Sequence, residues 1–314
     1  MTHDLTPRLG IHLTNFSNEE SPDWSALLDL ARAADGNGID KIVVSDHVVM
    51  GEHLDEYGKP EVGGVSGGKQ PTGPDGNWLE PLTLLSVLAG MTTNVRLGTH
   101  VLLAALRRPV VLAKSLSTLD VLTNGRLDIG IGVGWQKEEY DAAGLDFSTR
   151  GRLLDDTIEV LQTLWRNQSA TFEAGGRTVS GIHQMPKPRQ PGGVPIWVSG
   201  TLNKKVAERL AKYGSGWIPW GDAALDLTTS IPALWQMVEA AGGDTSGFRV
   251  AGNVAVQKRD DGTPDVAGSV EALGSQIDAG VTDFTLRVPL PSAAAAAEIF
   301  AEWSAAFRAA TGRS

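Results

Sequence analysis

The sequence contains no cysteine, and this absence excludes several kinds of site at once. Without cysteine there can be no disulfide, no thiolate zinc site and no cysteine nucleophile. Long apolar runs are also missing, because no stretch of the 314 residues reaches the length of a membrane-spanning helix. The amino terminus lacks the basic and then apolar pattern of a secretory signal. These absences predict a cytoplasmic protein with no membrane partner.

Positive charge is also scarce. The chain has 27 lysine and arginine residues against 37 aspartate and glutamate residues, which gives a net charge of −10. An acidic chain of this kind argues against a nucleic-acid partner. The length suffices for one large barrel or for two ordinary domains. No linker-like break interrupts the sequence, so we expect a single domain over residues 1–314.

Strand patterns alternate with helix patterns along the whole chain. Strands are predicted at 8–13, 41–45, 95–101, 127–133, 194–198, 216–218, 248–256 and 283–288. Helices are predicted at 22–34, 81–92, 109–122, 148–166, 204–212, 231–240 and 270–279, and a last helix carries Ile299, Trp303 and Phe307. Eight strands, each followed by a helix, predict an α/β fold with a single (β/α)8 TIM barrel. A doubly wound sheet is the alternative, but neither of its phosphate-binding glycine patterns follows the first strand.

Three segments are longer than such a barrel needs and are predicted to be insertion loops, at about 48–77, 135–148 and 168–193. The first is rich in glycine and proline. The third contains a predicted hairpin that turns at Gly175-Gly176. The first two loops are expected to form walls or lids of a pocket.

The strand predicted at 127–133 has an unusual face. Leu127, Ile129 and Ile131 alternate with Asp128 and with the glycines at 130, 132 and 134. A strand face with so few side chains leaves room there or lets the backbone approach another group. We therefore expect a buried parallel strand whose carboxyl end faces a ligand site. The alternative is that the glycines only permit tight packing inside the barrel.

In a barrel the site lies at the carboxyl ends of the strands, and Asp46-His47 follows one of them. A histidine beside a carboxylate can act as a general acid or base near neutral pH. The alternative is a structural histidine at the start of a loop. No metal site is expected, because His12 has no second histidine two positions away. No lysine lies at these strand ends, which argues against Schiff-base chemistry.

A second candidate is Ser199-Gly200-Thr201, which precedes a predicted helix. Small residues before a helix leave backbone N–H groups free to bind an anion, and Lys204 and Lys205 add positive charge. This arrangement predicts a phosphate site. An ordinary helix cap by Thr201 or Asn203 is the alternative.

Several segments resemble the bacterial luciferase-like flavin and deazaflavin oxidoreductases. The central one is Gly-Arg-Leu-Asp-Ile-Gly-Ile-Gly-Val-Gly-Trp-Gln-Lys-Glu-Glu-Tyr at 125–140. Others are Ser-Asp-His at 45–47, Glu-Pro-Leu-Thr-Leu-Leu at 80–85, Arg-Leu-Gly-Thr-His-Val-Leu at 96–102 and Gly-Trp-Ile-Pro-Trp at 216–220. The resemblance runs from about residue 8 to residue 290 and is closest to the branch that depends on coenzyme F420, a deazaflavin.

This resemblance implies a homodimeric barrel with the cofactor ring across its carboxyl-terminal mouth. Asp46 and His47 would contact the ring, and a non-prolyl cis peptide at His100-Val101 would lie against its back. The residues that the resemblance assigns to cofactor binding are Asp46, His47, His100, Val101, Gly134, Trp135, Glu138, Ser199, Gly200, Thr201, Gly216 and Trp217. Trp135 stands where the sugar-phosphate dehydrogenases of the family have a glutamate, and an indole cannot donate a proton as that acid does.

The function that follows is hydride transfer between F420 and a small organic substrate. His47 would be the general acid or base, Asp46 its orienting partner and His100 a second proton-transfer group. Arg287, at the end of the last strand, would anchor an acidic or carbonyl substrate, unless it forms a salt bridge at the rim.

Two alternatives remain open. One is a monooxygenase that uses FMN, and the other is a family member that binds the cofactor without catalysis. F420 has a long, polyacidic tail, so a basic track past Lys204, Lys205 and Arg209 would favour it over FMN.

Overall fold

The computed structural model describes residues 5–313, and their central feature is a closed barrel of eight strands. Going round the barrel, the order is β1-β14-β11-β10-β9-β6-β5-β3, and all neighbours are parallel. The strands are β1 (Arg8–His12), β3 (Lys41–Val44), β5 (Arg96–Leu102), β6 (Leu127–Ile131), β9 (Ile196–Gly200), β10 (Gly216–Pro219), β11 (Arg249–Asn253) and β14 (Asp283–Leu286). The predicted TIM barrel is confirmed, and the doubly wound alternative is wrong.

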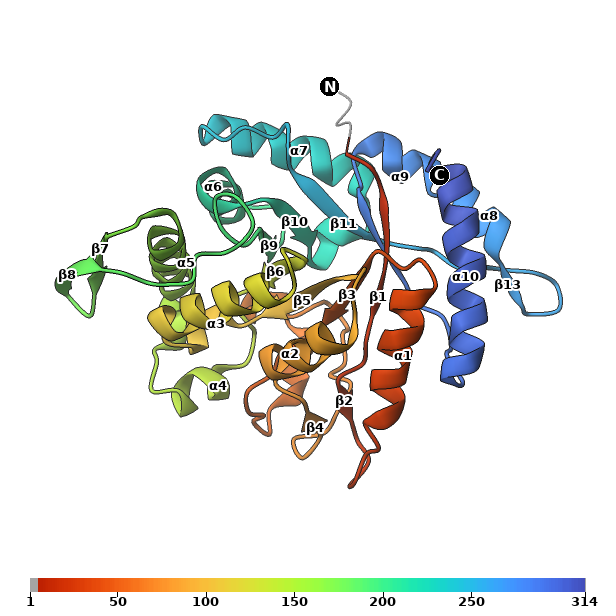
Figure 1. The fold of residues 1–314 in the computed structure, drawn as a ribbon, viewed down its shortest axis with the longest axis horizontal. Helices are drawn as coiled ribbons and strands as arrows, with labels where there is room; N and C mark the ends of the chain where they lie inside the picture. The colour runs from red at the N-terminus through yellow and green to blue at the C-terminus, as the bar shows by residue number, and fades with distance from the viewer. Residues whose placement is uncertain (1–4, 314) are drawn as a thin grey trace.

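Helices surround the barrel, and the first and last of them pack side by side (Figure 1). They are α1 (Ser25–Gly36), α2 (Pro81–Met91), α3 (Pro109–Leu122), α5 (Arg150–Arg166), α6 (Lys204–Tyr213), α7 (Leu227–Ala240), α8 (Val266–Glu271), α9 (Gly274–Ala279) and α10 (Ala293–Ala310). The single helix predicted at 270–279 is wrong. Asp265 accepts a hydrogen bond from Gly268 N and starts α8 earlier, so two short helices replace it.

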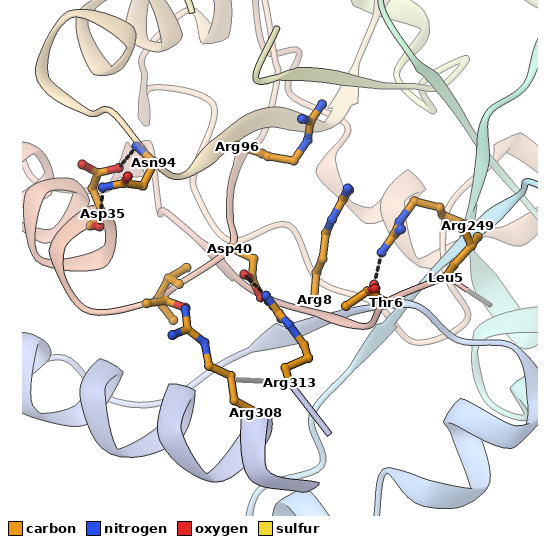
Figure 2. A pocket seen from close by; sticks show the side chains of 12 residues that line it. Leu5, Thr6, Arg8, Asp35, Asp40, Asn94, Arg96, Arg249, Arg308 and Arg313 are labelled. Atoms are coloured by element: carbon orange, nitrogen blue, oxygen red, sulfur yellow. Dashed lines mark hydrogen bonds and ion pairs between the residues drawn. The ribbon is translucent and has the colours of Figure 1, made fainter. Parts of the chain in front are cut away.

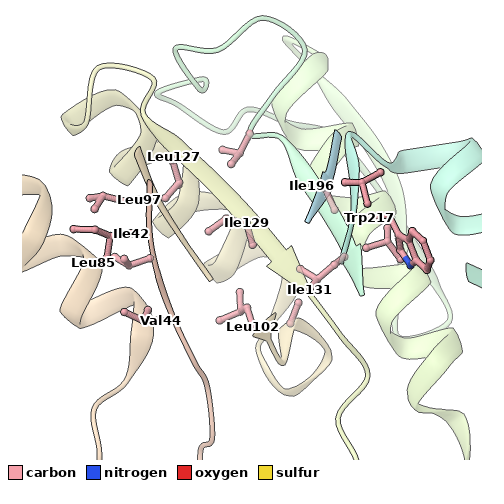
Figure 3. Packing of buried hydrophobic residues seen from close by; sticks show 14 of the residues in the cluster. Ile42, Val44, Leu85, Leu97, Leu102, Leu127, Ile129, Ile131, Ile196 and Trp217 are labelled. Atoms are coloured by element: carbon pink, nitrogen blue, oxygen red, sulfur yellow. The ribbon is translucent and has the colours of Figure 1, made fainter. Parts of the chain in front are cut away.

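Two hydrophobic layers follow from the alternation of side chains along the strands. The outward side chains of β6, Leu127, Ile129 and Ile131, pack between the barrel and its helices (Figure 3). A smaller cluster of Trp197, Ile218 and Ala251, with Val101 against it, forms a separate group. The larger layer attaches the helices to the barrel. We place the smaller one inside the barrel, because Ile218 lies against the glycine face of β6.

The glycines of β6 are explained by close packing. A Cβ on Gly130 would lie 2.2 Å from the carbonyl oxygen of Thr99 and 2.5 Å from the Ile218 side chain. On the neighbouring strand, a Cβ on Gly98 would lie 2.5 Å from the carbonyl oxygen of Asp128. The space beside Gly130 is therefore filled, and the packing alternative is correct for this residue. The carboxyl end of β6 nevertheless faces the mouth of the barrel.

The three insertions contain short elements. The loop 48–77 includes two 3-10 helices, η1 (Leu54–Gly58) and η2 (Pro60–Val62), and ends in β4 (Asn77–Trp78), which pairs with β2 (Phe16–Ser17). The predicted hairpin is confirmed as β7 (Ala170–Ala174) and β8 (Arg177–Ile182). The segment 135–148 contains α4 (Lys137–Ala142) and η4 (Phe147–Thr149), where only a loop was predicted.

Smaller elements complete the described chain: η3 (Ala104–Leu106), η5 (Gly221–Ala224), and the two-stranded pair β12 (Gln257–Lys258) and β13 (Pro264–Asp265). Within residues 5–313, none of the helices combines the length and the apolar character needed to cross a membrane.

Candidate active site

Polar side chains from neighbouring strand ends are linked at the mouth of the barrel. His12 Nε2 lies 2.8 Å from Ser45 Oγ, and Ser45 Oγ lies 3.4 Å from the carbonyl oxygen of His100. Asn15 fixes Ser45 from the other side, because its amide donates to Ser45 O and its oxygen accepts from Ser45 N, both at 2.9 Å. The ends of β1, β3 and β5 are thus held in register by side chains.

The peptide between His100 and Val101 is cis, as the resemblance implied. The pairing of β5 with β6 shifts between Thr99 and Leu102, so the strand carries a bulge at this point. Val101 packs against the cluster of Trp197, Ile218 and Ala251. An apolar surface therefore lies beneath the mouth.

Two histidines of the mouth have lowered pKa values. Burial, followed by the positive charge of Arg287, lowers the pKa of His12 to about 4. Burial is also the main reason that the pKa of His100 lies well below its usual value, with contributions from Lys41, His12 and Arg287. Both rings are therefore neutral near pH 7. His100 Nε2 is buried and has no hydrogen-bond partner in the described chain.

His47 is held by two side chains that the sequence did not point to. Its Nδ1 lies 3.1 Å from Glu139 Oε2, and its Nε2 lies 3.0 Å from the amide nitrogen of Gln70. The other carboxylate oxygen of Glu139 accepts from Val48 N at 2.8 Å. Glu139 therefore fixes both the imidazole and the backbone that follows it. Trp78 packs edge-on against the ring, with centroids 4.7 Å apart.

The Asp46 carboxylate makes no hydrogen bond to the His47 ring within the described residues. The prediction that Asp46 orients this histidine is therefore wrong. Its side chain is fully buried and makes two hydrogen bonds to the Arg107 guanidinium, at 2.6 and 3.0 Å. It also accepts from Leu103 N at 2.8 Å. Successive side chains of an extended segment point to opposite sides, so the two neighbours face different groups. Asp46 connects β3 to the segment after β5.

Glu139 was missed because its neighbour Glu138 was chosen from the same motif. Glu139 is 2% exposed, whereas Glu138 is half-buried and touches the long loop at Gly51. A short helix over 137–142 decides which of the two faces inward. The signal that could have found it is the run Lys-Glu-Glu-Tyr, whose residues all favour a helix more than a loop.

Aromatic side chains from different segments wall the mouth. Tyr57 packs edge-on against Trp135, with centroids 5.4 Å apart, and against Trp220 at 6.2 Å. Trp220 Nε1 donates to Gly63 O at 3.1 Å, which ties the loop 48–77 to the end of β10. Trp135 is buried, and its Nε1 has no hydrogen-bond partner in the described residues. The preceding Gly134 has φ +72, a conformation that glycine adopts easily.

The segment predicted to hold a phosphate has mixed support. Ser199 and Gly200 end β9 and are partly exposed, and Thr201 follows them. Asn203 caps α6, because its side chain accepts from Val206 N at 3.0 Å, and its amide donates to Thr201 Oγ1 at 2.9 Å. The cap alternative is thus correct for Asn203. An anion at residues 199–201 stays a prediction.

Burial argues against the predicted contact of Gly216 and Trp217 with the cofactor, which stays a prediction. Gly216 begins β10 and is buried against the Trp197 ring, far along the strand from its carboxyl end. Trp217 is fully buried in the layer between barrel and helices, and its Nε1 donates to Gly200 O at 3.0 Å. Trp217 therefore supports the loop of Gly200 from behind.

Only part of the basic track is present at the surface. Lys204 and Lys205 are exposed and lie 3.7 and 3.3 Å from the Glu208 carboxylate. Arg209 is buried and makes an ion pair with Asp155 at 2.6 Å. Arg209 consequently cannot contribute to an exposed track for an acidic tail.

Arg287 is exposed after β14 and makes no ion pair with any carboxylate of the described chain, so the rim salt bridge is not formed. Together with His12 it lines a cavity of about 640 Å³ beside the mouth. Most of the other lining residues are apolar, and they include Leu13, Trp24, Leu27, Leu286, Leu290 and Phe300, but the carboxylates Glu19 and Asp23 also line the cavity. The guanidinium thus meets a pocket with both apolar walls and acidic side chains. Residues 5–313 contain no group of three or more side chains that could hold a metal ion.

Comparison with known sequences places the chain in one family. The model for luciferase-like monooxygenases matches residues 8–267. An uncharacterized protein of Mycobacterium tuberculosis is 30% identical over 166 residues, which are 53% of this chain and 58% of that protein. An F420-dependent glucose-6-phosphate dehydrogenase of Kineococcus radiotolerans is 32% identical over 222 residues, 69% of this chain and 59% of that enzyme. The chain therefore matches less than two thirds of the length of these relatives.

Solved structures share the fold. An F420-dependent secondary alcohol dehydrogenase in complex with an F420-acetone adduct superposes with a TM-score of 0.70 and 18% identity, over 97% of this chain and 100% of that one. The oxygenating constituent of 3,6-diketocamphane monooxygenase from Pseudomonas putida, in complex with FMN, gives a TM-score of 0.68 and 14% identity, over 96% and 97% of the two chains. At these identities the likeness concerns the fold alone.

Proposed function

Since the chain belongs to the luciferase-like monooxygenase family, we propose that it is an oxidoreductase that transfers a hydride between coenzyme F420 and a small organic substrate. Relatives named F420-dependent glucose-6-phosphate dehydrogenase, 32% and 28% identical, support F420 over FMN. We further propose that the protein is cytoplasmic and acts as a homodimer.

The observation that carries the proposal is a pair of polar atoms at the mouth. His100 Nε2 and Trp135 Nε1 are both buried and lack a hydrogen-bond partner in the described chain. Burying such atoms without a partner is costly, so sites of this kind favour a ligand that supplies the missing hydrogen bonds. A planar ring with polar edges fits, because Val101 offers an apolar surface on one side and the Trp135 indole a wall on another.

When bound, the deazaflavin supplies the hydride chemistry. His47 supplies or accepts the proton at Nε2, because Glu139 occupies Nδ1 and the Gln70 amide at Nε2 is the partner that a substrate can replace. His100 stays neutral and serves as a hydrogen-bonding group, so its predicted role as a second proton-transfer residue is revised. The loop 48–77 contacts Trp220 through the Tyr57 ring and the carbonyl oxygen of Gly63, and in this position it excludes water from the mouth.

Arg287 and the cavity beside it define the substrate that we propose. An acidic or carbonyl oxygen would bind the guanidinium, and an apolar body would occupy the pocket next to Trp24 and Phe300. Glucose 6-phosphate is a poor match for this lining. Trp135 also replaces the acid that the resemblance assigns to the sugar-phosphate dehydrogenases.

The test is a cofactor titration of the full-length protein with F420 and, separately, with FMN, followed by quenching of tryptophan and cofactor fluorescence. We expect micromolar binding of F420 and weak binding of FMN, and His100→Ala should weaken F420 binding about tenfold through the lost hydrogen bond. His183→Ala, outside the mouth, is the matched control. Preference for FMN would shift the assignment to a monooxygenase, and binding of neither would refute the cofactor assignment.

A further inference from the structure

A second large cavity lies at the opposite, amino-terminal end of the barrel and takes no part in the proposed reaction. Its volume is about 640 Å³, and the starts of β1, β5 and β11, the loop after α1 and the end of α10 enclose it (Figure 2). Five arginines line this basal cavity: Arg8, Arg96, Arg249, Arg308 and Arg313. Such a concentration of cations is unexpected in a chain with a net charge of −10.

Carboxylates near the basal cavity neutralise only part of this charge. Asp128 binds Arg96 at 2.7 Å, Asp283 binds Arg249 at 2.7 Å, and Asp40 binds Arg313 at 2.6 Å. The fourth carboxylate, Asp35, accepts hydrogen bonds from the backbone N–H groups of residues 93–95. Lys41 adds a sixth cation behind the lining. Arg126 and Asp120 also act on Arg96, so among residues 5–313 seven cations face five carboxylates, which leaves two positive charges in excess.

The excess resides on Arg8 and Arg308. The Arg8 guanidinium is 28% exposed, has no hydrogen bond in the described chain, and lies 3.8–3.9 Å from carboxylates that other arginines bind more closely. Its pKa is lowered by burial and by the neighbouring charge of Arg249. Among the described residues, Arg308 donates only to the carbonyl oxygen of Gly38, at 3.3 Å. Both guanidinium groups thus have unused donors at the cavity.

We propose that the basal cavity is a binding site for a small phosphate-bearing anion. Guanidinium groups donate paired hydrogen bonds that match phosphate oxygens, and two uncompensated arginines would neutralise one phosphate dianion. The cavity volume falls within the range of small-molecule sites, so a phosphorylated metabolite fits as well as inorganic phosphate. This site is separate from the mouth and does not depend on the proposed F420 chemistry.

The competing interpretation is a purely structural charge cluster that contains water. Asp283 Oδ1 is buried and has no hydrogen-bond partner within residues 5–313, and a water bridging it to Arg8 or Lys41 would satisfy it. The two interpretations differ in what Arg8 does. In a structural cluster its removal destabilises the protein, whereas in an anion site its removal relieves repulsion and abolishes the response to phosphate.

The experiment measures the Tm of the full-length protein against the concentration of inorganic phosphate, with chloride at matched ionic strength as the reference. We expect phosphate to raise the Tm by roughly 2–4 °C at saturation. Arg308→Met should weaken the apparent affinity about tenfold, because one charge-assisted partner is lost. Arg166→Met is the matched control, since Arg166 also lies in the last turn of a helix and donates to a glycine carbonyl, that of Gly192 at 3.1 Å.

A second variant and a second probe make the result decisive. Arg8→Met should abolish the phosphate-dependent rise while leaving the Tm in chloride unchanged or higher. A phosphorylated probe such as glucose 6-phosphate, compared with inorganic phosphate, separates a metabolite site from a site for the free ion. If the Tm in phosphate equals the Tm in chloride, the site does not exist. If the rise in Tm with phosphate persists in both Arg308→Met and Arg8→Met, phosphate does not bind in the basal cavity. That second result would place the binding elsewhere, including the segment 199–201.

Discussion

At the residue scale, two carboxylates near the mouth have separate tasks: Asp46, which follows β3, and Glu139 of α4. Asp46 joins β3 to Arg107, while Glu139 reaches His47 from α4. Asp46 is therefore a structural residue of the mouth. Glu139 positions the histidine that we propose as the acid or base.

We expect Asp46→Asn to destabilise the protein by about 3 kcal/mol, since it removes the charge that pairs with the mostly buried Arg107. Glu139→Gln should leave the urea midpoint nearly unchanged but reduce turnover roughly tenfold or more, because it keeps the shape and weakens the orientation of His47. Urea unfolding and steady-state rates with reduced F420 measure the two effects. If Asp46→Asn lost turnover without losing stability, Asp46 would not have the structural role that we assign to it.

Stability should also depend on pH through His12. Its pKa in the folded protein is about 4, below the 6.5 of an unperturbed histidine. The unfolded chain therefore binds a proton as the pH falls below 6.5 and the folded chain does not, so stability decreases from about pH 6.5 to about pH 4. We expect a loss of about 3 kcal/mol from this residue across that window, of which about 2 kcal/mol falls between pH 7 and pH 5.

Urea unfolding at pH 7 and pH 5 measures this loss, and His12→Gln should reduce the difference between the two. His53→Gln, in the exposed part of the loop 48–77, is the control. The carboxylate Asp128 has its pKa lowered to about 2, so it titrates below this window. An identical pH dependence in His12→Gln and the wild type would exclude His12 as its source.

At the element scale, β6 shows what its glycines are for. The outward face of the strand holds apolar side chains against the helices, and the inward face lies close to β5 and β10. Neighbouring parallel strands leave little room inside a barrel of eight, so a missing side chain on one strand admits the backbone or side chain of the next.

Gly130→Ala should accordingly destabilise the protein by about 1–3 kcal/mol or prevent folding. Its Cβ would lie 2.2 Å from the carbonyl oxygen of Thr99, which belongs to a strand and cannot move freely. Gly90→Ala is the matched control on α2, where no atom lies within 4 Å of the new Cβ, and it should stabilise by about 0.5–1 kcal/mol. Thermal unfolding of both variants checks this, and equal Tm values would show that β6 adjusts more than we infer.

At the scale of the whole molecule, the outer faces of α2 and α3 expose large apolar side chains. Val87 of α2 and Val110, Val111, Val121 and Leu122 of α3 are each at least 40% exposed. The two helices pack together on the surface of the barrel (Figure 1). Large apolar side chains exposed on neighbouring helices are typical of an interaction surface.

The homodimer that the resemblance implied stays a prediction, and we expect it to use this face. Sedimentation velocity should give a dimer for the wild type and a monomer for Val111→Glu/Leu122→Glu, because buried carboxylates would oppose association. Leu225→Glu, which alters a side chain that is 84% exposed elsewhere, should remain a dimer. A monomeric wild type at micromolar concentration would refute the prediction.

The amino-acid sequence by itself determined the barrel and the strand ends that surround its mouth. Apolar residues with a period of two on strands and of 3.6 on helices are local signals, so β6 and α5 were found at nearly their observed bounds. The resemblance also located the cis peptide at His100-Val101 and the loops beside it. The position of Arg287 near the mouth could be predicted because the carboxyl ends of all barrel strands lie at the same end of the barrel, and its substrate role stays a prediction.

Only the tertiary structure decided which side chains meet. His47 and Glu139 lie 92 positions apart in the sequence, and no local sequence pattern indicates that their side chains meet. The sequence did not show that Gly216 and Trp217 are buried, because burial on one side of a strand depends on the neighbouring strands. The basal cavity is the clearest case, since its arginines come from three strands, from α10 and from the segment after α10, and its excess charge exists only where they converge. Direct contacts between distant residues follow from packing of the whole chain, and a period along the sequence cannot encode them.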